Sequence, residues 1–416
     1  MFGSSKRRLG VAAVGLSAAL ALAACSSGDS GDDAASEETA AEETAAEETA
    51  AEETTSEETS ADEACELPSE VRLISVDSIT GPAGFAGVVA ENGAQIAVQE
   101  INDSGYLGDG VTMTIDVYDD ATNPDQGTTE FAKALGEDVP LVFGSVTSGV
   151  AVAQAPLAEA EGKPVVFTQA GSPGVVIGDY TFRFTPPMSA YWPDVASYLA
   201  EQGVETASVL YANDFPTLID VAEVSVPQVA DEVGIEILSS TGIPTATEDF
   251  SAPINKIAQE DPDAVIMLLV GPANPTAMNQ LRQAGLTDVV VVGNSGAGNG
   301  NLAPAGENGA GMLWPALFHP DQDRPALQEF VEKYQAEFGE IPSTYGPERY
   351  DAVYAVADAI KEACSVDPQE VRDALASITE AGYSGVMGDV TFENQDIRVP
   401  GILVQWNGEE ELLIAE

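Results

Sequence analysis

The chain has 416 residues, of which 69 are Asp or Glu and 15 are Lys or Arg, so its formal net charge is −54. The roughly 350 residues from Leu67 onward are enough for two domains with substantial cores. A strongly negative surface repels nucleic acid and anionic lipid headgroups, and this argues against both as binding partners.

The first 24 residues predict a signal peptide. The basic residues Lys6–Arg8 precede an uncharged, apolar run from Leu9 to Ala24. This run is shorter than the roughly 20 residues that span a bilayer, and it has the layout of a cleaved secretory signal. The segment Leu22–Cys25 resembles a bacterial lipobox, in which the cysteine becomes the acylated N-terminus. We therefore expect an extracytoplasmic protein that Cys25 anchors to the cell membrane through lipid; the alternative is an ordinary signal with an incidental cysteine.

Residues 25–66 predict a lipid-anchored, disordered acidic linker. Between Asp29 and Glu66 there are 16 acidic residues and no basic ones, and a Glu-Glu-Thr-Ala-Ala pentad recurs from Glu37 onward. Residues 26–64 contain no large aliphatic or aromatic side chain, so nothing compensates the entropy lost on ordering. We interpret the segment as a spacer, with specific cation binding as the alternative.

From Leu67 onward, short β-branched runs alternate with helical stretches. The predicted strands are 71–76, 111–117, 141–143, 164–167, 207–210, 235–238, 264–269 and 289–292. The predicted helices between them include 84–102, 148–160, 190–201, 217–233, 252–259 and 275–284. This alternation favours parallel sheets that are wound as βαβ units.

The pattern changes after Trp314. Three helical stretches, 325–338, 347–363 and 368–378, precede a predicted β-hairpin around Val399–Trp406. A chain that repeats βα units and then ends in this way suggests two lobes with crossings between them.

Two cysteines lie outside the lipobox. Outside the cytoplasm, Cys65 and Cys364 are plausible disulfide partners, and their bond would close a very long loop. The alternative is a pair of free thiols.

Several sequence blocks together resemble a known family. They are spread over residues 71–416 and read Thr80-Gly81-Pro82, Asn92-Gly93-Ala94, Phe143-Gly144-Ser145, Phe182-Arg183-Phe184-Thr185, Asp249-Phe250-Ser251, Leu281-Arg282-Gln283-Ala284-Gly285 and Tyr350-Asp351-Ala352-Val353. The chain resembles the type I periplasmic (solute) binding proteins. Within that group it is similar to the branched-chain amino-acid (leucine/isoleucine/valine) binding proteins of ABC transporters, in lipoprotein form.

The resemblance implies an α/β fold of two doubly wound lobes, with parallel central sheets and three crossover segments. Residues 71–186 and 315–385 would form lobe 1, and residues 187–314 and 386–416 would form lobe 2. A small ligand would bind between the lobes, at the ends of the parallel strands, and hinge closure would bury it.

Two serines at predicted strand-to-helix turns suggest one end of the ligand site. Ser148 and Ser172 follow strands, where hydroxyls and free backbone N–H groups suit a carboxylate or carbonyl oxygen. In the resembling family, the positions that match Ser148, Ala170 and Ser172 hold the ligand's carboxylate. Helix capping is the alternative role for the two hydroxyls.

The other end of the family's site is not retained. Ser295 stands where the family has the acid that binds the ligand's amino group, and Ala273 stands where it has a tyrosine. An aromatic lid position falls on Ala86, beside Phe85, and Phe215 matches a further aromatic position. A buried ammonium without a carboxylate partner is costly. We therefore expect a neutral or purely acidic small molecule rather than a standard α-amino acid, unless another acid in the cleft replaces the lost one.

The sequence favours a binder over an enzyme. Its single histidine, His319, has no nucleophile motif beside it, and neither a P-loop nor a Cys/His metal cluster is present. We expect no cofactor, no metal and a monomeric protein that captures an amino-acid-like, carboxylate or amide ligand. Its partners would be an ABC permease and ATPase subunits; the alternative is an extracellular sensor that feeds a signalling partner.

Overall fold

The computed structural model describes residues 65–415 except residues 299 and 400. The predicted signal peptide, the lipidation site Cys25 and all of the predicted linker before Cys65 lie outside the described residues. Within the described ranges, no helix is long and apolar enough to span a membrane.

The first lobe is built on an eight-stranded sheet with the strand order β11-β12-β13-β5-β4-β3-β1-β2. The strands β1 to β5 are parallel to their neighbours, whereas β11, β12 and β13 pair in antiparallel fashion. The strand bounds are β1 Glu70–Asp77, β2 Thr112–Asp119, β3 Val142–Phe143, β4 Val165–Phe167, β5 Thr181–Arg183, β11 Tyr383–Gly385, β12 Gly388–Glu393 and β13 Asp396–Arg398.

The second lobe is built on a seven-stranded sheet with the order β15-β14-β10-β9-β8-β6-β7. Its strands β6 to β10 are parallel, and β14 is antiparallel to both β10 and β15. The strand bounds are β6 Thr206–Ala212, β7 Glu236–Ile243, β8 Ala264–Leu268, β9 Val290–Gly293, β10 Leu313–Ala316, β14 Ile402–Trp406 and β15 Glu411–Ala415.

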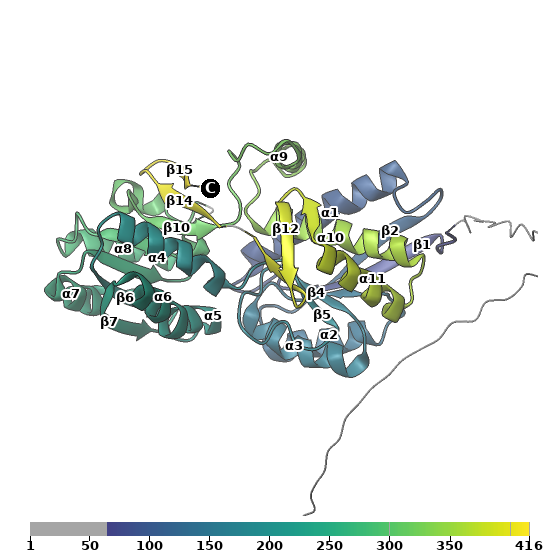
Figure 1. The fold of residues 1–416 in the computed structure, drawn as a ribbon, viewed down its shortest axis with the longest axis horizontal. Coiled ribbons are helices and arrows are strands. Elements are labelled where there is room, and N and C mark those ends of the chain that lie inside the picture. The colour runs from purple at the N-terminus through teal and green to yellow at the C-terminus, as the bar shows by residue number, and fades with distance from the viewer. Residues whose placement is uncertain (1–64, 299, 400, 416) are drawn as a thin grey trace, which may run out of the picture. The chain divides into compact units, whose positions relative to one another are not determined.

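Helices pack on both sheets (Figure 1). In the first lobe they are α1 Gly84–Ser104, α2 Pro124–Leu135, α3 Ser148–Glu161, α9 Pro325–Phe338, α10 Tyr345–Ala363 and α11 Pro368–Ala381. In the second lobe they are α4 Trp192–Glu201, α5 Pro216–Asp220, α6 Val226–Val233, α7 Ser251–Glu260 and α8 Ala273–Gln283. Short turns of helix complete the set: η1 Met188–Tyr191, the π-helical η2 Val221–Ser225, η3 Ser295–Ala297 and η4 Ala303–Gly309.

The close packing of α1 against α10 positions the first turn of α10. A Cβ atom added to Gly93 on α1 would lie 2.1 Å from the carbonyl oxygen of Gly346 on α10. Only glycine permits this approach, which brings the first turn of α10 directly against α1. Further along α10, Val353, Val356 and Ile360 are fully buried against the sheet.

Over the part of the chain that the structure describes, the backbone passes between the two sheets three times. It crosses after β5, after β10, and between β13 and β14. These passages match the three crossover segments that the sequence predicts, and the two-lobed α/β fold is confirmed.

The sheet pairings correct the boundary expected at Val386. Strands β12 and β13 form a hairpin that adds to the first sheet, where Asp396 lies in register with Arg183. The two side chains form an ion pair with an N–O distance of 2.7 Å, which ties the hairpin to β5. Residues up to Arg398 therefore belong to the sheet of the first lobe, and the last crossing lies between Arg398 and Ile402.

Two smaller expectations are also corrected. Strand β10 continues to Ala316, two residues beyond the expected end of the second-lobe segment at Trp314. The hairpin expected at Val399–Trp406 is instead formed by β14 with β15, because β14 runs on to Trp406 before the chain turns.

Cys65 and Cys364 form a disulfide bond with their Cα atoms 5.4 Å apart. The two residues are 299 positions apart in sequence. The bond joins the start of the described chain to the residue that follows the end of α10.

Candidate functional site

A cavity of about 140 Å³ lies between the two lobes and is lined by residues of both. The first lobe contributes residues from the starts of α1, α3 and α10 and from the loops after β4 and β5; the second contributes residues that follow β6, β8 and β9. Most of these segments begin where a parallel strand ends, which is the usual position of a ligand site in an open α/β sheet.

Four of the seven predicted ligand residues line this cavity: Phe85, Ser148, Phe215 and Ser295. They come from four separate segments in two lobes, so the fold brings together residues that are up to 210 positions apart in sequence.

The other three predicted residues lie behind the lining. Ala170 is fully buried between the lining residues Gln169 and Gly171. Ser172 is also buried and contacts the lining residue Ser148. Ala273 begins α8 and is half-buried, away from the lining.

Three hydroxyl groups meet across the gap between the lobes. The Thr217 hydroxyl, on α5 of the second lobe, lies 3.0 Å from the Ser148 Oγ and 2.7 Å from the Ser172 Oγ. The backbone N–H of Ser172 also donates to the Ser148 Oγ at 3.2 Å. The Ser148 hydroxyl therefore contacts both of the other segments. We call Ser148, Ser172 and Thr217 the hydroxyl cluster.

Arg183 holds the loop that carries one member of this cluster. Its guanidinium donates to the carbonyl oxygens of Ala170 and Ser172, both at 2.9 Å, and pairs with Asp396. A buried arginine with its charge paired and its donors used fixes the path of the loop. The loop after β4 is thereby rigid where it meets the cavity.

Two asparagines shape the second-lobe wall. The Asn294 side chain accepts from the N–H of Gly296 at 2.7 Å and donates to the Leu269 carbonyl at 3.0 Å. The Asn274 amide donates to the Gly271 carbonyl at 3.0 Å and to the Gly296 carbonyl at 3.3 Å. These bonds join the loops after β8 and β9, and they place Ser295 in the wall.

Aromatic side chains supply much of the apolar lining. Phe85 and Tyr345 pack edge to face with ring centroids 6.0 Å apart, and Tyr191 and Phe215 also line the cavity. Phe85 is 48% exposed, so it lies at the edge of the cavity and not in its interior. Apolar walls with a few placed polar groups are typical of small-molecule sites.

One carboxyl group lines the cavity. Glu348, in the first turn of α10, is 1% exposed. It accepts hydrogen bonds from the Gln169 amide at 2.8 Å, the Thr185 hydroxyl at 3.1 Å and the Thr344 hydroxyl at 3.3 Å. Burial raises the pKa of this carboxyl to about 8, although the three donors oppose the shift.

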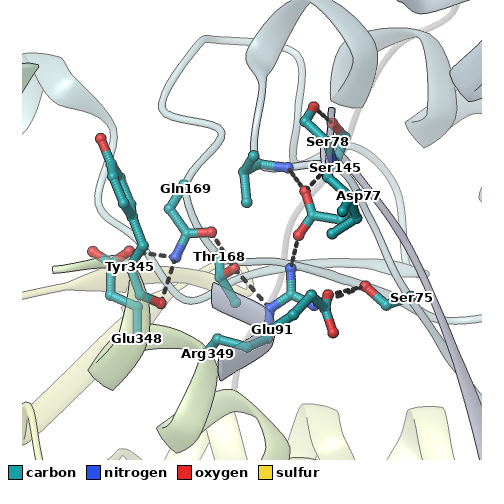
Figure 2. Close-up of polar contacts among 12 residues, drawn as sticks. Ser75, Asp77, Ser78, Glu91, Ser145, Thr168, Gln169, Tyr345, Glu348 and Arg349 are labelled. Carbon is teal, nitrogen blue, oxygen red and sulfur yellow. Dashed lines mark hydrogen bonds and ion pairs between the residues drawn. The ribbon is translucent and has the colours of Figure 1, made fainter. Parts of the chain in front are cut away.

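A buried polar network supports Glu348 from behind (Figure 2). The Gln169 amide bridges the Glu348 carboxylate and the Tyr345 carbonyl, and its oxygen accepts from the Thr168 hydroxyl at 2.5 Å. Thr168 in turn accepts from Arg349 at 3.1 Å. The network thus links the cavity wall to the core of the first lobe.

Arg349 is the centre of that network. Its guanidinium is fully buried and pairs with Asp77 at 2.7 Å and with Glu91 at 3.3 Å (Figure 2). Two acids therefore take up its charge, and both of its carboxylate partners lie outside the cavity lining.

Sequence reasoning missed Thr217, Gln169 and Glu348. Thr217 follows Pro216 at the start of the helix after β6. A hydroxyl residue at such a strand-to-helix turn is a signal of a ligand site that the sequence does contain. Gln169 lies two residues after the end of the predicted strand 164–167, which is a similar signal. Glu348 had no comparable signal, because an acid in a first helical turn is common for electrostatic reasons alone.

A cavity that two α/β lobes enclose, with hydroxyls at strand ends and apolar walls, defines a two-lobed solute-binding protein. The chain belongs to the family described as "Periplasmic binding protein", whose sequence profile matches residues 70–409. This confirms the resemblance found in the sequence, and the family is one of binding proteins rather than enzymes. Its members act outside the cytoplasm.

Individual relatives support the same assignment. The chain is 25% identical over 323 residues to the leucine-, isoleucine-, valine-, threonine-, and alanine-binding protein of Pseudomonas aeruginosa, covering 76% of this chain and 85% of that one. The structure of the branched-chain amino acid transporter substrate binding protein LivJ from Streptococcus pneumoniae, in complex with isoleucine, has a TM-score of 0.74 at 23% identity and covers 83% of this chain and all of that one. A solute binding protein of an ABC transporter from R. palustris, in complex with benzoate, has a TM-score of 0.74 at 18% identity, covering 83% and 96% of the two chains.

Proposed function

We propose that this protein is the extracytoplasmic solute-binding lipoprotein of an ABC importer. It captures a small amino-acid-like or carboxylate ligand between its lobes and delivers it to the permease. The observation that carries the proposal is the cavity, whose lining is shared between two lobes that three crossings connect within the described residues. Such a site opens and closes when one lobe rotates against the other.

The hydroxyl cluster is suited to hold a carboxylate. Hydroxyl groups donate one hydrogen bond each and rotate freely, so Ser148 and Thr217 can turn their O–H bonds from one another towards a ligand oxygen. Because these residues come from different lobes, a carboxylate that both of them bind stabilises the closed arrangement.

The named ligands of similar proteins fit this chemistry. Isoleucine and benzoate are bound by two of the structures with the same fold, and both ligands carry a carboxylate beside an apolar group. The aromatic walls and the hydroxyl cluster offer complementary surfaces for those two parts.

The attachment to the membrane is proposed from the sequence alone. Acylation of Cys25 would hold the protein at the membrane surface, near its permease, and raise its effective concentration there. Metabolic labelling with an alkyne fatty acid tests this directly, because a Cys25→Ser variant would lose the label and be released from membranes.

A binding screen tests the main proposal. A ligand that binds only the folded protein raises its melting temperature, and the shift grows with the logarithm of ligand concentration above the Kd. We expect one or a few small carboxylates from a metabolite collection to produce such a shift, and we expect uptake of that compound to fall when the gene is deleted. A clear binder without an uptake defect would point to sensing instead of transport.

A further inference from the structure

Glu348 is the only residue in the described cavity lining that would ordinarily carry a charge at neutral pH. The other lining residues include no Lys, Arg, His or Asp. The single carboxyl is also one of the most deeply buried groups of the site, with 1% of its surface exposed. A binding site with one charged group and no counter-charge is unusual enough to require a reason.

Among the residues that the structure describes, no cation is paired with Glu348. Its hydrogen-bond donors, Gln169, Thr185 and Thr344, are all neutral. The adjacent Arg349 attracts it at a distance, but the guanidinium of that residue is bonded to Asp77 and Glu91. A buried carboxylate without a paired cation is costly, so it must either hold a proton or receive a cation from outside.

We propose that Glu348 is a specificity-determining residue of the cavity and pairs with an ammonium group of the ligand, so that an amine binds more tightly than its deamino counterpart. This inference rests on the proposed function and names its ligand class. The acidic anchor would lie on α10 of the first lobe, whereas the position of the family's acid on the second lobe holds Ser295. The hydroxyl cluster would bind the other end of the same molecule.

The surroundings of Glu348 favour replacement of its proton by a ligand ammonium. The ionisable groups that face it are Tyr345 and Arg349 on α10 and Tyr191 on η1. Burial raises the pKa of both tyrosine hydroxyls, so they stay neutral near pH 7 and do not compete for an ammonium. The N-terminus of α10 favours the ionised carboxylate once a cation is present.

Replacement of the Glu348 proton by an ammonium would release that proton, and the release can be measured. With a pKa of about 8, Glu348 holds its proton at pH 7, and pairing with an ammonium would drive that proton into solution. Ligand binding would therefore release up to about one proton per molecule at pH 7 and fewer at pH 9. A purely acidic ligand would not cause this release.

The test compares each amine with its deamino partner. Isothermal titration would use L-leucine with 4-methylpentanoate, L-alanine with propanoate, L-phenylalanine with 3-phenylpropanoate, and 4-aminobutanoate with butanoate. We expect at least one amine to bind wild-type protein roughly 30-fold more tightly than its partner, and we expect Glu348→Gln to abolish that preference. Repeating the titration in two buffers with different ionisation enthalpies measures the released proton.

The Gln variant is a close steric match. The hydroxyls of Thr185 and Thr344 can reverse their hydrogen bonds to accept from its amide, while its oxygen still accepts from Gln169. Asp358→Asn is the matched control: Asp358 is a half-buried acid on the same helix, its oxygen accepts from the Tyr106 hydroxyl as an asparagine oxygen also can, and it lies outside the cavity lining. That variant should keep both the amine preference and the proton release.

The outcomes separate this inference from the proposed function. If a deamino acid binds as tightly as its amine, or if Glu348→Gln keeps the preference, the inference is wrong while the solute-binding role stands. If no compound of the panel binds wild-type protein, the inference is also wrong. The proposed function fails as well only if the wider metabolite screen yields no binder.

Discussion

The Thr217 hydroxyl of the second lobe donates a hydrogen bond to the Ser148 Oγ of the first lobe, with 3.0 Å between the two oxygens. Thr217 also lies 2.7 Å from the Ser172 hydroxyl, so a single side chain bridges two segments of the opposite lobe. The bridge crosses the same gap that a ligand must enter. In the function that we propose, closure of the lobes and binding of a carboxylate would depend on the same three hydroxyls.

Replacing Thr217 with Val should shift the lobes towards an open arrangement. The change keeps the side-chain shape but removes two hydrogen bonds, together worth about 1–3 kcal/mol. Small-angle X-ray scattering without added ligand should give a larger radius of gyration than wild type, and ligand affinity should fall about tenfold. Thr128→Val on the exposed surface of α2 is the control. Identical scattering from the Thr217→Val variant and wild type would contradict the bridge.

Glu348→Gln should change how stability depends on pH. The pKa of Glu348 is raised from 4.5 to about 8, so the native state holds a proton that the unfolded chain releases between these values. Wild type therefore loses stability at this position as the pH rises from 4.5 through 8, and the variant does not. Urea unfolding should show similar free energies of unfolding at pH 4.5 and an advantage of several kcal/mol for the variant at pH 9. A difference that stays constant with pH would refute this assignment.

Arg349→Met should strongly destabilise the first lobe. The substitution leaves Asp77 fully buried without its cation and Glu91 without one of its partners. Removing one partner of a buried pair typically costs about 3–5 kcal/mol. Arg72, whose pair with Asp116 is partly exposed, offers a control, because Arg72→Met should cost about 1 kcal/mol or less. If both variants lost the same free energy of unfolding in chemical denaturation, burial of the ion pair would not be the cause of the loss.

Loss of the Cys65–Cys364 disulfide should lower stability without touching the site. Neither cysteine lines the cavity, and the bond closes a loop of 299 residues. A Cys65→Ser/Cys364→Ser double variant should lose about 2–5 kcal/mol in the free energy of unfolding. Its ligand affinity at 25 °C should equal that of wild type, and a reducing agent should lower the melting temperature of wild type only.

A second acid at the position of Ser295 should rescue the Glu348→Gln variant. Ser295 lines the cavity from the second lobe, at the position where the resembling family has its amine-binding acid. Glu348→Gln/Ser295→Glu should regain a preference for amines over their deamino partners in isothermal titration. A double variant that binds no amine, although it unfolds like wild type, would show that the cavity cannot accept a cation from that side.

The sheets were largely predictable because their strands are short, apolar and separated by helices of regular length. Residues 264–268, for example, are all buried in β8, as an uninterrupted apolar run in a parallel sheet should be. The hairpin of β12 and β13 was missed because its strands are short and half-exposed. Its turn depends on Asn394 and Gln395, which adopt positive φ values of 52° and 64°.

Apart from the positions taken from the family resemblance, cavity-lining residues could be predicted only where a polar residue follows a strand. Ser148 and Ser295 fall at such places, since parallel strands of one sheet end at the same edge. Glu348 reaches the cavity by another route: α10 packs so closely on α1, at Gly93, that its first turn enters the wall. That contact joins residues more than 250 positions apart, and no local pattern announces it.

The disulfide has a mechanical consequence. A force applied to the chain before Cys65 is transmitted through the disulfide to the end of α10. It therefore does not act on β1 alone, which begins five residues later. The same helix begins at the cavity with Tyr345 and Glu348, and its 19 residues span about 28 Å. If the protein is tethered by its N-terminus, the load enters through the first lobe, which also carries Glu348. Within the described residues, the second lobe, which carries Thr217, is connected to this point of attachment only through the first lobe.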